Sequence, residues 1–321
     1  MPISVNRDLK IFSGRSNRPL ATKISRILDK DLGNVSIKNF SDGEIWAKYE
    51  ENIRGQDVFI IQSTNAPAEN LLELLILIDA ARRASAYRIT AVIPYFSYAR
   101  QDRKDQPRVA VTSKLAANLI VTAGAHRVLT MDLHAPQIQG FFDIPLDHLY
   151  AATVFIDHIN SLNIPDLSIA SPDIGGMNLC RSYARRLDTD LVMLDKRRLK
   201  HNVCEVTRLI GDVKGKNILV VDDLIDTGGT LAGGIKVLKK NGAKDIYVAC
   251  THAILSGNAI ENIKNSKIKK MFLTDSVKTD ENKLCDKIDI LSVANLLAEA
   301  IIRIHEERSI SDLFPEKGPI L

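Results

Sequence analysis

The chain has 321 residues, which is long enough for two domains that each bury a hydrophobic core. Its hydrophobic content of 45% and charged content of 26% are typical of globular proteins, and a net charge of +4 is too small to indicate a nucleic-acid partner. No apolar run approaches the roughly 20 residues that cross a membrane, and the first residues lack the apolar segment of a signal peptide.

The first part of the chain alternates apolar strands with amphipathic helices. We predict strands over residues 9–14, 57–62 and 89–94, and helices over residues 19–32 and 70–86. Another strand begins at Ser36 and leads into Phe40-Ser41-Asp42-Gly43-Glu44, where the Asp-Gly pair is typical of a hairpin turn. Strands that alternate with helices in short units predict parallel sheets covered by helices.

A polar segment over residues 95–108 follows the strand that ends at Pro94 and is dense in both charges. Most such runs are solvated surface loops. The alternative is a mobile lid, because loops of this length without their own secondary structure are often functional. Positive side chains brought down on a polyphosphate would then exclude water and offset negative charge.

The stretch from Met131 to Pro145 follows a strand predicted over residues 128–131. Asp132 and His134 are two positions apart on an extended segment and therefore point to the same face. A lone histidine is more often hydrogen-bonded within the fold than bound to a ligand, so the residues alone leave both alternatives open.

Two stretches of the chain repeat one another. Residues 115–135 and residues 231–253 each contain a helix, a Gly-Ala turn, a strand and a His-Ala pair. The repeat predicts a duplicated α/β domain with a boundary near Leu149-Tyr150, which gives domains over residues 1–149 and 150–321. We assign no role to His252.

Polar stretches also follow the strands of the second half. A strand at 168–170 precedes Ser171-Pro172-Asp173-Ile174-Gly175-Gly176, which is either a plain turn or a loop whose backbone N–H groups suit phosphate oxygens. A strand at 191–194 precedes the basic run 195–201, which is either a solvated face or a group of cations at a site. Ligands of parallel sheets collect at the carboxyl ends of strands, where these stretches lie.

The most distinctive stretch runs from Val220 to Thr230. A buried strand over residues 217–221 leads into a turn with acids at its start and a Gly-Gly pair, and a helix follows up to Asn241-Gly242. Glycines and a helix start suit a phosphate, whereas the acids suit sugar hydroxyls or a magnesium ion. An ordinary strand-to-helix connection is the alternative for the short motif alone.

The complete Val220–Thr230 string resembles the phosphoribosyl-binding loop of type I phosphoribosyltransferases and of ribose-phosphate pyrophosphokinases, the synthetases of 5-phosphoribosyl 1-diphosphate (PRPP). The Met131–Pro145 string resembles a signature of the second group that simple phosphoribosyltransferases lack. Four motifs occur in the expected order and the resemblance extends to Phe314, so the chain is similar to the bacterial-type class I pyrophosphokinases.

This resemblance implies a fold and a set of residue roles. The expected fold class is α/β, with two duplicated type I phosphoribosyltransferase-like domains, each a mainly parallel sheet flanked by helices. The catalytic cations are Lys196 and Arg198. Ribose 5-phosphate is bound by Arg198, Asp222, Asp223, Asp226, Thr227, Gly228, Gly229 and Thr230. ATP is bound by Phe40, Asp42, Gly43, Glu44, Arg100 and Gln101, and the cofactor Mg²⁺ by His134 and Asp173. A regulatory region matches Arg54, Ser309, Ser311 and Phe314.

The implied reaction transfers the pyrophosphoryl group of ATP to the C1 hydroxyl of ribose 5-phosphate, giving PRPP and AMP for nucleotide, histidine and tryptophan biosynthesis. The resemblance also implies a homo-oligomer, expected to be a hexamer, with phosphate and ADP as regulators. This sequence departs from many relatives at Leu199, where they carry proline, and at Asn52, where they carry serine. The widely spaced Cys180, Cys204, Cys250 and Cys285 favour free thiols in the cytoplasm.

Two other functions remain open at the level of the sequence. A phosphoribosyltransferase that consumes PRPP would share the turn at residues 222–230 but would need neither an adenine site nor Asp132-Leu133-His134. A non-catalytic regulatory partner would be expected to have lost cationic residues, and the presence of Arg100, Lys196 and Arg198 argues against it.

Overall fold

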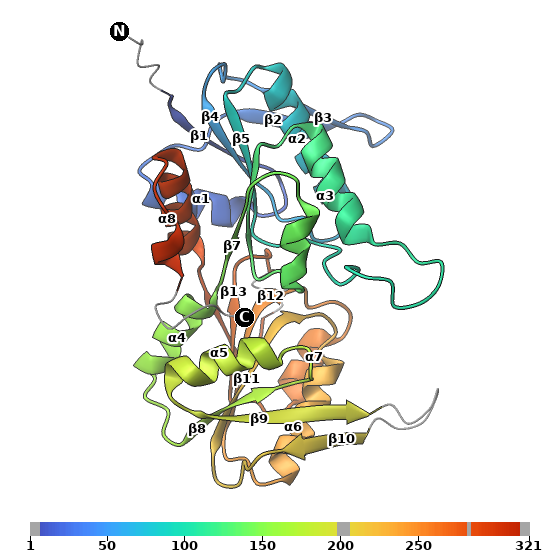
Figure 1. Ribbon diagram of the computed structural model, residues 1–321, viewed down its shortest axis with the longest axis vertical. Helices are drawn as coiled ribbons and strands as arrows, with labels where there is room; N and C mark the ends of the chain where they lie inside the picture. Colours follow the sequence, from blue (N-terminus) through green and yellow to red (C-terminus); the bar gives the residue numbers. More distant parts are fainter. Residues whose placement is uncertain (1–6, 198–205, 281–283, 315–321) are drawn as a thin grey trace. The chain divides into compact units, whose positions relative to one another are not determined.

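The computed structural model describes residues 7–197, 206–280 and 284–314 (Figure 1). The chain divides into two compact units. The first comprises Met1–Leu149, Ser276–Lys278 and Ala294–Leu313, and the second comprises Tyr150–Asp275, Thr279–Val293 and Phe314–Leu321. Within the described ranges, none of the helices has the length and apolar character needed to span a membrane.

The first unit is built on a five-stranded parallel sheet. Its strands are β1 (Leu9–Ser13), β4 (Asp57–Ile61), β5 (Arg88–Ile93), β6 (Arg127–Met131) and β7 (Leu146–Leu149), in the order β1-β4-β5-β6-β7. A separate antiparallel hairpin consists of β2 (Val35–Asn39) and β3 (Ile45–Tyr49). The helices are α1 (Arg18–Ile27), α2 (Glu69–Arg83), α3 (Thr112–Ala123), η1 (Pro136–Phe141), α8 (Ala294–His305) and η3 (Ser311–Leu313).

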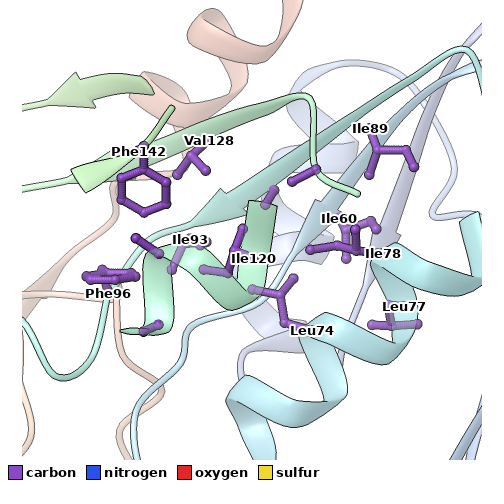
Figure 2. Close-up of a cluster of buried hydrophobic side chains, with 14 of the residues drawn as sticks. Ile60, Leu74, Leu77, Ile78, Ile89, Ile93, Phe96, Ile120, Val128 and Phe142 are labelled. Atoms are coloured by element: carbon purple, nitrogen blue, oxygen red, sulfur yellow. The ribbon is translucent and has the colours of Figure 1, made fainter. Parts of the chain in front are cut away.

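Apolar side chains from both layers fill the core of the first unit, because parallel strands covered by helices are buried on both faces. Every residue of β4 is buried. Figure 2 shows Leu74 and Ile78 of α2 and Ile120 of α3 packed with side chains of the strands. The rings of Phe96 and Phe142 meet edge to face with centroids 5.8 Å apart, next to the strand ends.

The second unit is built on a seven-stranded sheet. Its strands are β8 (Leu167–Ser171), β9 (Asp190–Arg197), β10 (Val206–Ile210), β11 (Asn217–Ile225), β12 (Ile246–Ala253), β13 (Lys270–Thr274) and β14 (Ile288–Leu291), in the order β10-β9-β8-β11-β12-β13-β14. All neighbours are parallel except β9 and β10. The helices are α4 (Ala152–Ser161), α5 (Met177–Leu187), α6 (Gly229–Lys240) and α7 (Ala259–Asn265).

The two sheets share one topology. In each, the first strand pairs with the strand that follows a two-stranded hairpin, and three more parallel strands are added in chain order. Thus β1, β4, β5 and β6 correspond to β8, β11, β12 and β13. The two duplicated α/β domains predicted from the sequence are therefore present. The repeat quoted above matches β6 to β12, whereas the strand order matches β5 to β12, so its register was wrong by one strand.

Each sheet is followed by a helix that packs in the other unit. Helix α4 follows β7 of the first sheet and packs against α5, and α8 follows β14 of the second sheet and packs against α1. The domain ranges 1–149 and 150–321 remain a prediction. After β14 the chain returns to the first unit, which includes Ala294–Leu313.

Several elements differ in length from the prediction, among them α1 and β9. Helix α1 ends at Ile27, not at residue 32, because Asp29 adopts a left-handed conformation with φ of 50° that stops the helix. Strand β9 continues from residue 194 to Arg197, because its backbone pairs with β10.

Candidate active site

The motifs of the second unit lie at one edge of its sheet. Strands β8 and β11 are parallel neighbours, so their carboxyl ends point to the same edge. The loop 172–176 leaves β8 there, and the turn 226–228 leaves β11 there. Two of the stretches selected from the sequence are therefore adjacent in the fold.

The turn after β11 has the backbone conformation that its glycines allow. Gly228 caps α6 with φ of 70°, a left-handed conformation that an L side chain adopts only with strain, and Gly229 starts the helix. Thr227, Gly229 and Thr230 are exposed. The first N–H groups of a helix have no intrahelical partner, and together with the helix dipole they favour an anion.

Two residues that the sequence analysis missed hold this turn. The Ser256 N–H donates to the Asp226 carbonyl at 3.1 Å, and the Ser256 hydroxyl donates to the Asp226 carboxylate. The Asn262 side-chain amide donates to the Thr227 carbonyl at 2.9 Å. Both come from the segment after β12. Ser256 begins a polar Ser-Gly-Asn that follows an apolar strand, and Asn262 lies in α7 without a sequence signal of its own.

Asp222 and Asp223 form a crowded acidic pair. Burial raises the pKa of the Asp222 carboxyl well above its ordinary value, and the negative charges of Asp223 and Asp173 raise it further. The Asp223 N–H donates to Asp222 Oδ1 at 3.0 Å, which folds the Asp222 side chain back over the next peptide. The strand was predicted to end at residue 221, before the two acids, but β11 continues through both of them to Ile225.

The loop after β8 is organised by Asp173. Its Oδ1 accepts the Gly176 N–H at 2.9 Å, and its carbonyl accepts the Ser171 hydroxyl at 2.6 Å. The Gly176 N–H, which was expected to suit a phosphate oxygen, is therefore already paired with a carboxylate. The exposed Asp173 side chain is close enough to Asp222 to contribute to the rise in its pKa.

Lys196 lies on a strand instead of the loop that was expected. In the backbone register of the antiparallel pair, its Cα is paired with that of Thr207 of β10. Ser171, the last residue of β8, pairs with Met193, so Lys196 lies beyond the carboxyl end of β8, where the loop 172–176 begins. Residues 195–198 are rich in basic side chains, which is unusual for a strand. For this reason the sequence analysis predicted that the strand ends at residue 194. The second predicted cation, Arg198, lies outside the described residues.

His134 lies at the corresponding edge of the first unit, after β6. It is exposed, whereas Asp132 is 7% exposed and has a positive φ of 37°. The Asp132 N–H donates to the Leu149 carbonyl at 3.0 Å, and the Leu133 N–H donates to Nε2 of the buried His148 at 2.8 Å. Strand β7 therefore fixes the backbone on which His134 stands. His148 is a second residue that the sequence analysis missed.

Arg100 and Gln101 lie in the long loop between β5 and α3, at the same edge as His134. The Gln101 carbonyl accepts from the N–H of Ser113 at 3.3 Å and from its hydroxyl at 3.0 Å, which ties the loop to the start of α3. The Gln137 amide donates to the Asp102 carboxylate at 2.7 Å and joins the loop to η1. Residues 103–108 are all exposed.

Phe40, Asp42, Gly43 and Glu44 form the turn of the β2–β3 hairpin, as the Asp-Gly pair predicts. The Phe40 N–H donates to the Glu44 carbonyl at 2.8 Å, and Gly43 has φ of 98°. The Phe40 ring is 56% exposed. An exposed ring on a two-stranded hairpin is available to a planar ligand or to another subunit.

The four residues of the expected regulatory region come from two segments of the chain, one before β4 and one after α8. Arg54 is exposed in the turn before β4. The Ser309 carbonyl accepts from the Arg303 side chain at 2.8 Å, and the Ser311 N–H donates to the Ser309 hydroxyl at 3.1 Å. Ser309 and Ser311 therefore lie in the segment that directly follows α8. Phe314 packs against Tyr150 with ring centroids 6.0 Å apart, in the second unit.

No group of three or more His, Cys, Asp or Glu side chains that could hold a metal ion occurs among the described residues. A magnesium ion carried by substrate phosphates needs no such group, because it takes only one or two protein ligands. The acidic crowding around Asp222 and Asp173 also fits a cation, because a positive charge would relieve it.

Known proteins match this chain over nearly its whole length. Residues 9–124 match the N-terminal domain of ribose phosphate pyrophosphokinase, and residues 185–315 match the phosphoribosyl synthetase-associated domain. The ribose-phosphate pyrophosphokinase of Chlorobaculum tepidum is 58% identical over 97% of this chain and 96% of that protein, and that of Corynebacterium ammoniagenes is 52% identical over 97% and 98%. The crystal structure of phosphoribosylpyrophosphate synthetase from Mycobacterium smegmatis is 38% identical with a TM-score of 0.89, and the match covers 94% of this chain and 100% of that chain.

Proposed function

This chain belongs to the ribose-phosphate pyrophosphokinase family, and on that premise we propose that it transfers the pyrophosphoryl group of Mg-ATP to the C1 hydroxyl of ribose 5-phosphate. The products are PRPP and AMP. The observation that carries the proposal for this chain's own residues is the turn 226–230, where a left-handed Gly228 opens a helix beside an acidic pair.

The turn binds the 5-phosphate. The first-turn N–H groups of α6 and the exposed hydroxyls of Thr227 and Thr230 offer donors on one side of the helix start. Ser256 and Asn262 hold the backbone of residues 226 and 227, so these donors are fixed before the substrate arrives. A fixed geometry lowers the entropic cost of binding.

Asp222 and Asp223 accept hydrogen bonds from the ribose hydroxyls. A carboxylate accepts but does not donate when ionised, and hydroxyls donate, so the pair matches a diol and disfavours a second phosphate. The pKa of Asp222 is raised by burial and by the negative charges of Asp223 and Asp173, and hydrogen bonds donated by ribose hydroxyls would stabilise its ionised form. The bound sugar orients its C1 hydroxyl for attack on the β-phosphorus.

Cationic side chains stabilise the transferring group. We assign this role to Lys196 and Arg198 of the second unit and to Arg100 of the long loop in the first. Pyrophosphoryl transfer needs an in-line approach and dispersal of charge over non-bridging oxygens more than it needs a protein nucleophile. A preorganised charge of this kind typically contributes about 3–4 kcal/mol, or roughly a hundred- to a thousandfold in rate.

His134 and Asp173 would hold the magnesium ion, which when bound supplies charge neutralisation on the ATP phosphates. Phe40 stacks on adenine, Asp42, Gly43 and Glu44 line the same site, and Arg100 and Gln101 contact ATP. The exposure of the Phe40 ring supports a site that a neighbouring subunit completes.

The assembly and its control are part of the proposal. We assign a homo-oligomer, a hexamer by family resemblance, located in the cytoplasm, with phosphate and ADP acting at a region that includes Arg54, Ser309, Ser311 and Phe314. The exposed positions of Arg54, Ser309 and Ser311 support a regulatory surface.

The direct test incubates the purified protein with ATP and ribose 5-phosphate and follows nucleotides by chromatography, with and without EDTA and over a range of phosphate. The proposal predicts AMP, equal in amount to PRPP, and its loss with EDTA. ADP as the sole nucleotide product, or AMP formation independent of ribose 5-phosphate, would rule it out.

A further inference from the structure

A basic groove lies between α6 and α7 in the second unit, on residues that the proposed reaction does not use. It has a volume of about 480 Å³, and its lining includes Lys236, Lys239, Lys240, Lys267, Asn262 and Asn265. We propose that this groove, hereafter the lysine groove, binds a small polyanion that carries two or more phosphate groups.

Three of the four lysines that line the lysine groove are not neutralised within the described part of the chain; the fourth, Lys239, donates to the Lys244 carbonyl and interacts electrostatically with Asp245. Lys236 and Lys240 are exposed and four positions apart, so they lie on one face of α6, where like charges repel. Among the described residues, no carboxylate lies within ion-pair distance of Lys236, Lys240 or Lys267. Glu261, the acid of α7, does not line the groove. A bound anion would relieve this repulsion.

The other lining groups define the class of ligand. Lysines are point charges that suit phosphate, and the amides of Asn262 and Asn265 add neutral donors. The lysines come from two separate segments, so an anion with several phosphate groups neutralises more of them than a single phosphate does. The volume matches small-molecule sites, and the partly apolar lining from Ala232 and Ile235 accepts a sugar or ring.

The lysine groove is connected to the turn that binds the 5-phosphate. Asn262 lines the groove and donates to the Thr227 carbonyl at 2.9 Å. Lys236, Lys239 and Lys240 stand on the helix that begins at Gly229, directly after that turn. An occupant that engages Asn262 therefore acts on the backbone of Thr227. This second step rests on the proposed function, and it predicts that occupancy changes the KM for ribose 5-phosphate, with reciprocal effects on binding.

The binding step is tested on the full chain by lysine acetylation followed by mass spectrometry. The buffer contains 0.15 M salt, at which the Debye length is about 8 Å, so weak long-range attraction between exposed charges is largely screened. The probes are inorganic tripolyphosphate, ATP and inorganic phosphate. We expect tripolyphosphate to slow the modification of Lys236, Lys240 and Lys267 severalfold, with a smaller effect of phosphate. Lys264, an exposed lysine of α7 outside the groove, is the internal control and should not change.

The matched variants are Lys236→Glu/Lys240→Glu and the control Lys264→Glu, all at exposed positions that tolerate substitution. The apparent Kd for tripolyphosphate, measured by the protection of Lys267, should rise by about tenfold or more in the double variant and stay unchanged in the control. Stronger protection by ATP than by tripolyphosphate assigns the site to a nucleoside polyphosphate; equal protection assigns it to inorganic polyphosphate.

Unchanged modification of the three groove lysines, or equal protection of Lys264, would overturn the proposal. The readout requires no turnover, so an active enzyme without protection refutes the groove alone. Protection in a protein that forms no AMP refutes the proposed reaction alone.

Discussion

The carboxylate Oδ2 of Asp57 lies 2.8 Å from Nδ1 of His305, although the two residues are 248 positions apart. Asp57 opens β4 and is 1% exposed, and His305 ends α8. Arg88 of β5 binds both carboxylate oxygens of Asp57, at 2.9 and 2.5 Å, and also donates to the Ile304 carbonyl at 2.9 Å. This cluster fastens the helix that follows the second sheet to the strands of the first.

Asp57→Ala should destabilise the protein strongly. Removing one partner of a buried ion pair leaves the other charge uncompensated, which typically costs about 3–5 kcal/mol. The change is measured as the free energy of unfolding in urea. Asp79→Ala is the matched control, because its ion pair with Arg83 is exposed and screened by solvent, so its loss should change the free energy of unfolding far less. Equal effects of the two substitutions would remove the structural role given to Asp57.

His126 should make stability fall as the pH falls. Its Nδ1 accepts the Ile89 N–H at 3.0 Å, and burial lowers its pKa, assisted by the positive charges of Arg82 and Arg88. The unfolded chain therefore binds a proton at a pH where the folded chain does not. The contribution is complete above the ordinary pKa of about 6.5 and is lost as the pH falls through the folded-state pKa, with a slope of at most about 1.4 kcal/mol per pH unit.

His126→Asn keeps a hydrogen-bond acceptor and removes this titration. Urea denaturation at several pH values between 5 and 8 should therefore show a shallower decline in the free energy of unfolding for the variant, by roughly one proton. An identical slope for the two proteins would show that His126 does not titrate differently on folding.

His148 should act on activity without touching substrate, by positioning the backbone beside His134. In His148→Phe the buried Leu133 N–H loses its acceptor, and groups that support metal ligands typically contribute about 10–100-fold to metal affinity or activity. We expect a higher magnesium concentration for half-maximal PRPP formation. His148→Gln supplies an acceptor near the position of Nε2, so its magnesium concentration for half-maximal PRPP formation should be close to that of the wild type. Failure of glutamine to differ from phenylalanine would reduce the role of His148 to packing.

Gly228→Ala should weaken ribose 5-phosphate binding through backbone strain. A non-glycine residue at φ of 70° costs about 1–3 kcal/mol, and the turn 226–230, which we propose binds the 5-phosphate, would relax away from its conformation. The KM for ribose 5-phosphate should rise more than the KM for ATP. Gly233→Ala is the control on the same helix, because its side chain enters open space, and it should stabilise the protein by about 0.5–1 kcal/mol.

The sequence predicted most strands, the α/β class and the duplication, because parallel strands read as continuous apolar runs and the helices as amphipathic ones. It misaligned the duplication, since every strand-helix unit of such a fold carries a similar pattern. Helix, Gly-Ala turn and strand occur around both β6 and β12, although the strand order equates β12 with β5. The order of strands in the two sheets therefore decides which strands correspond, whereas the local sequence pattern does not.

The candidate site was predicted as a set of motifs but not as a set of contacts. The turn 226–230 is identifiable because its backbone requires a glycine at Gly228, where φ is 70°. Ser256, Asn262 and His148 were missed because each acts through one hydrogen bond to a backbone group that is distant in sequence. The extension of β9 through Lys196 was missed because cation-rich segments are poor strand formers in isolation, and only pairing with β10 keeps it extended.

Pyrophosphoryl transfer can be followed directly with ATP labelled at the β-phosphorus in the reaction with ribose 5-phosphate. We expect the label to leave the nucleotide and appear in PRPP, and the AMP to be unlabelled. Lys196→Ala should slow this transfer by roughly a hundredfold or more while its urea unfolding stays near wild type. Label retained in ADP, or a folded Lys196→Ala protein with unchanged turnover, would contradict the proposed mechanism.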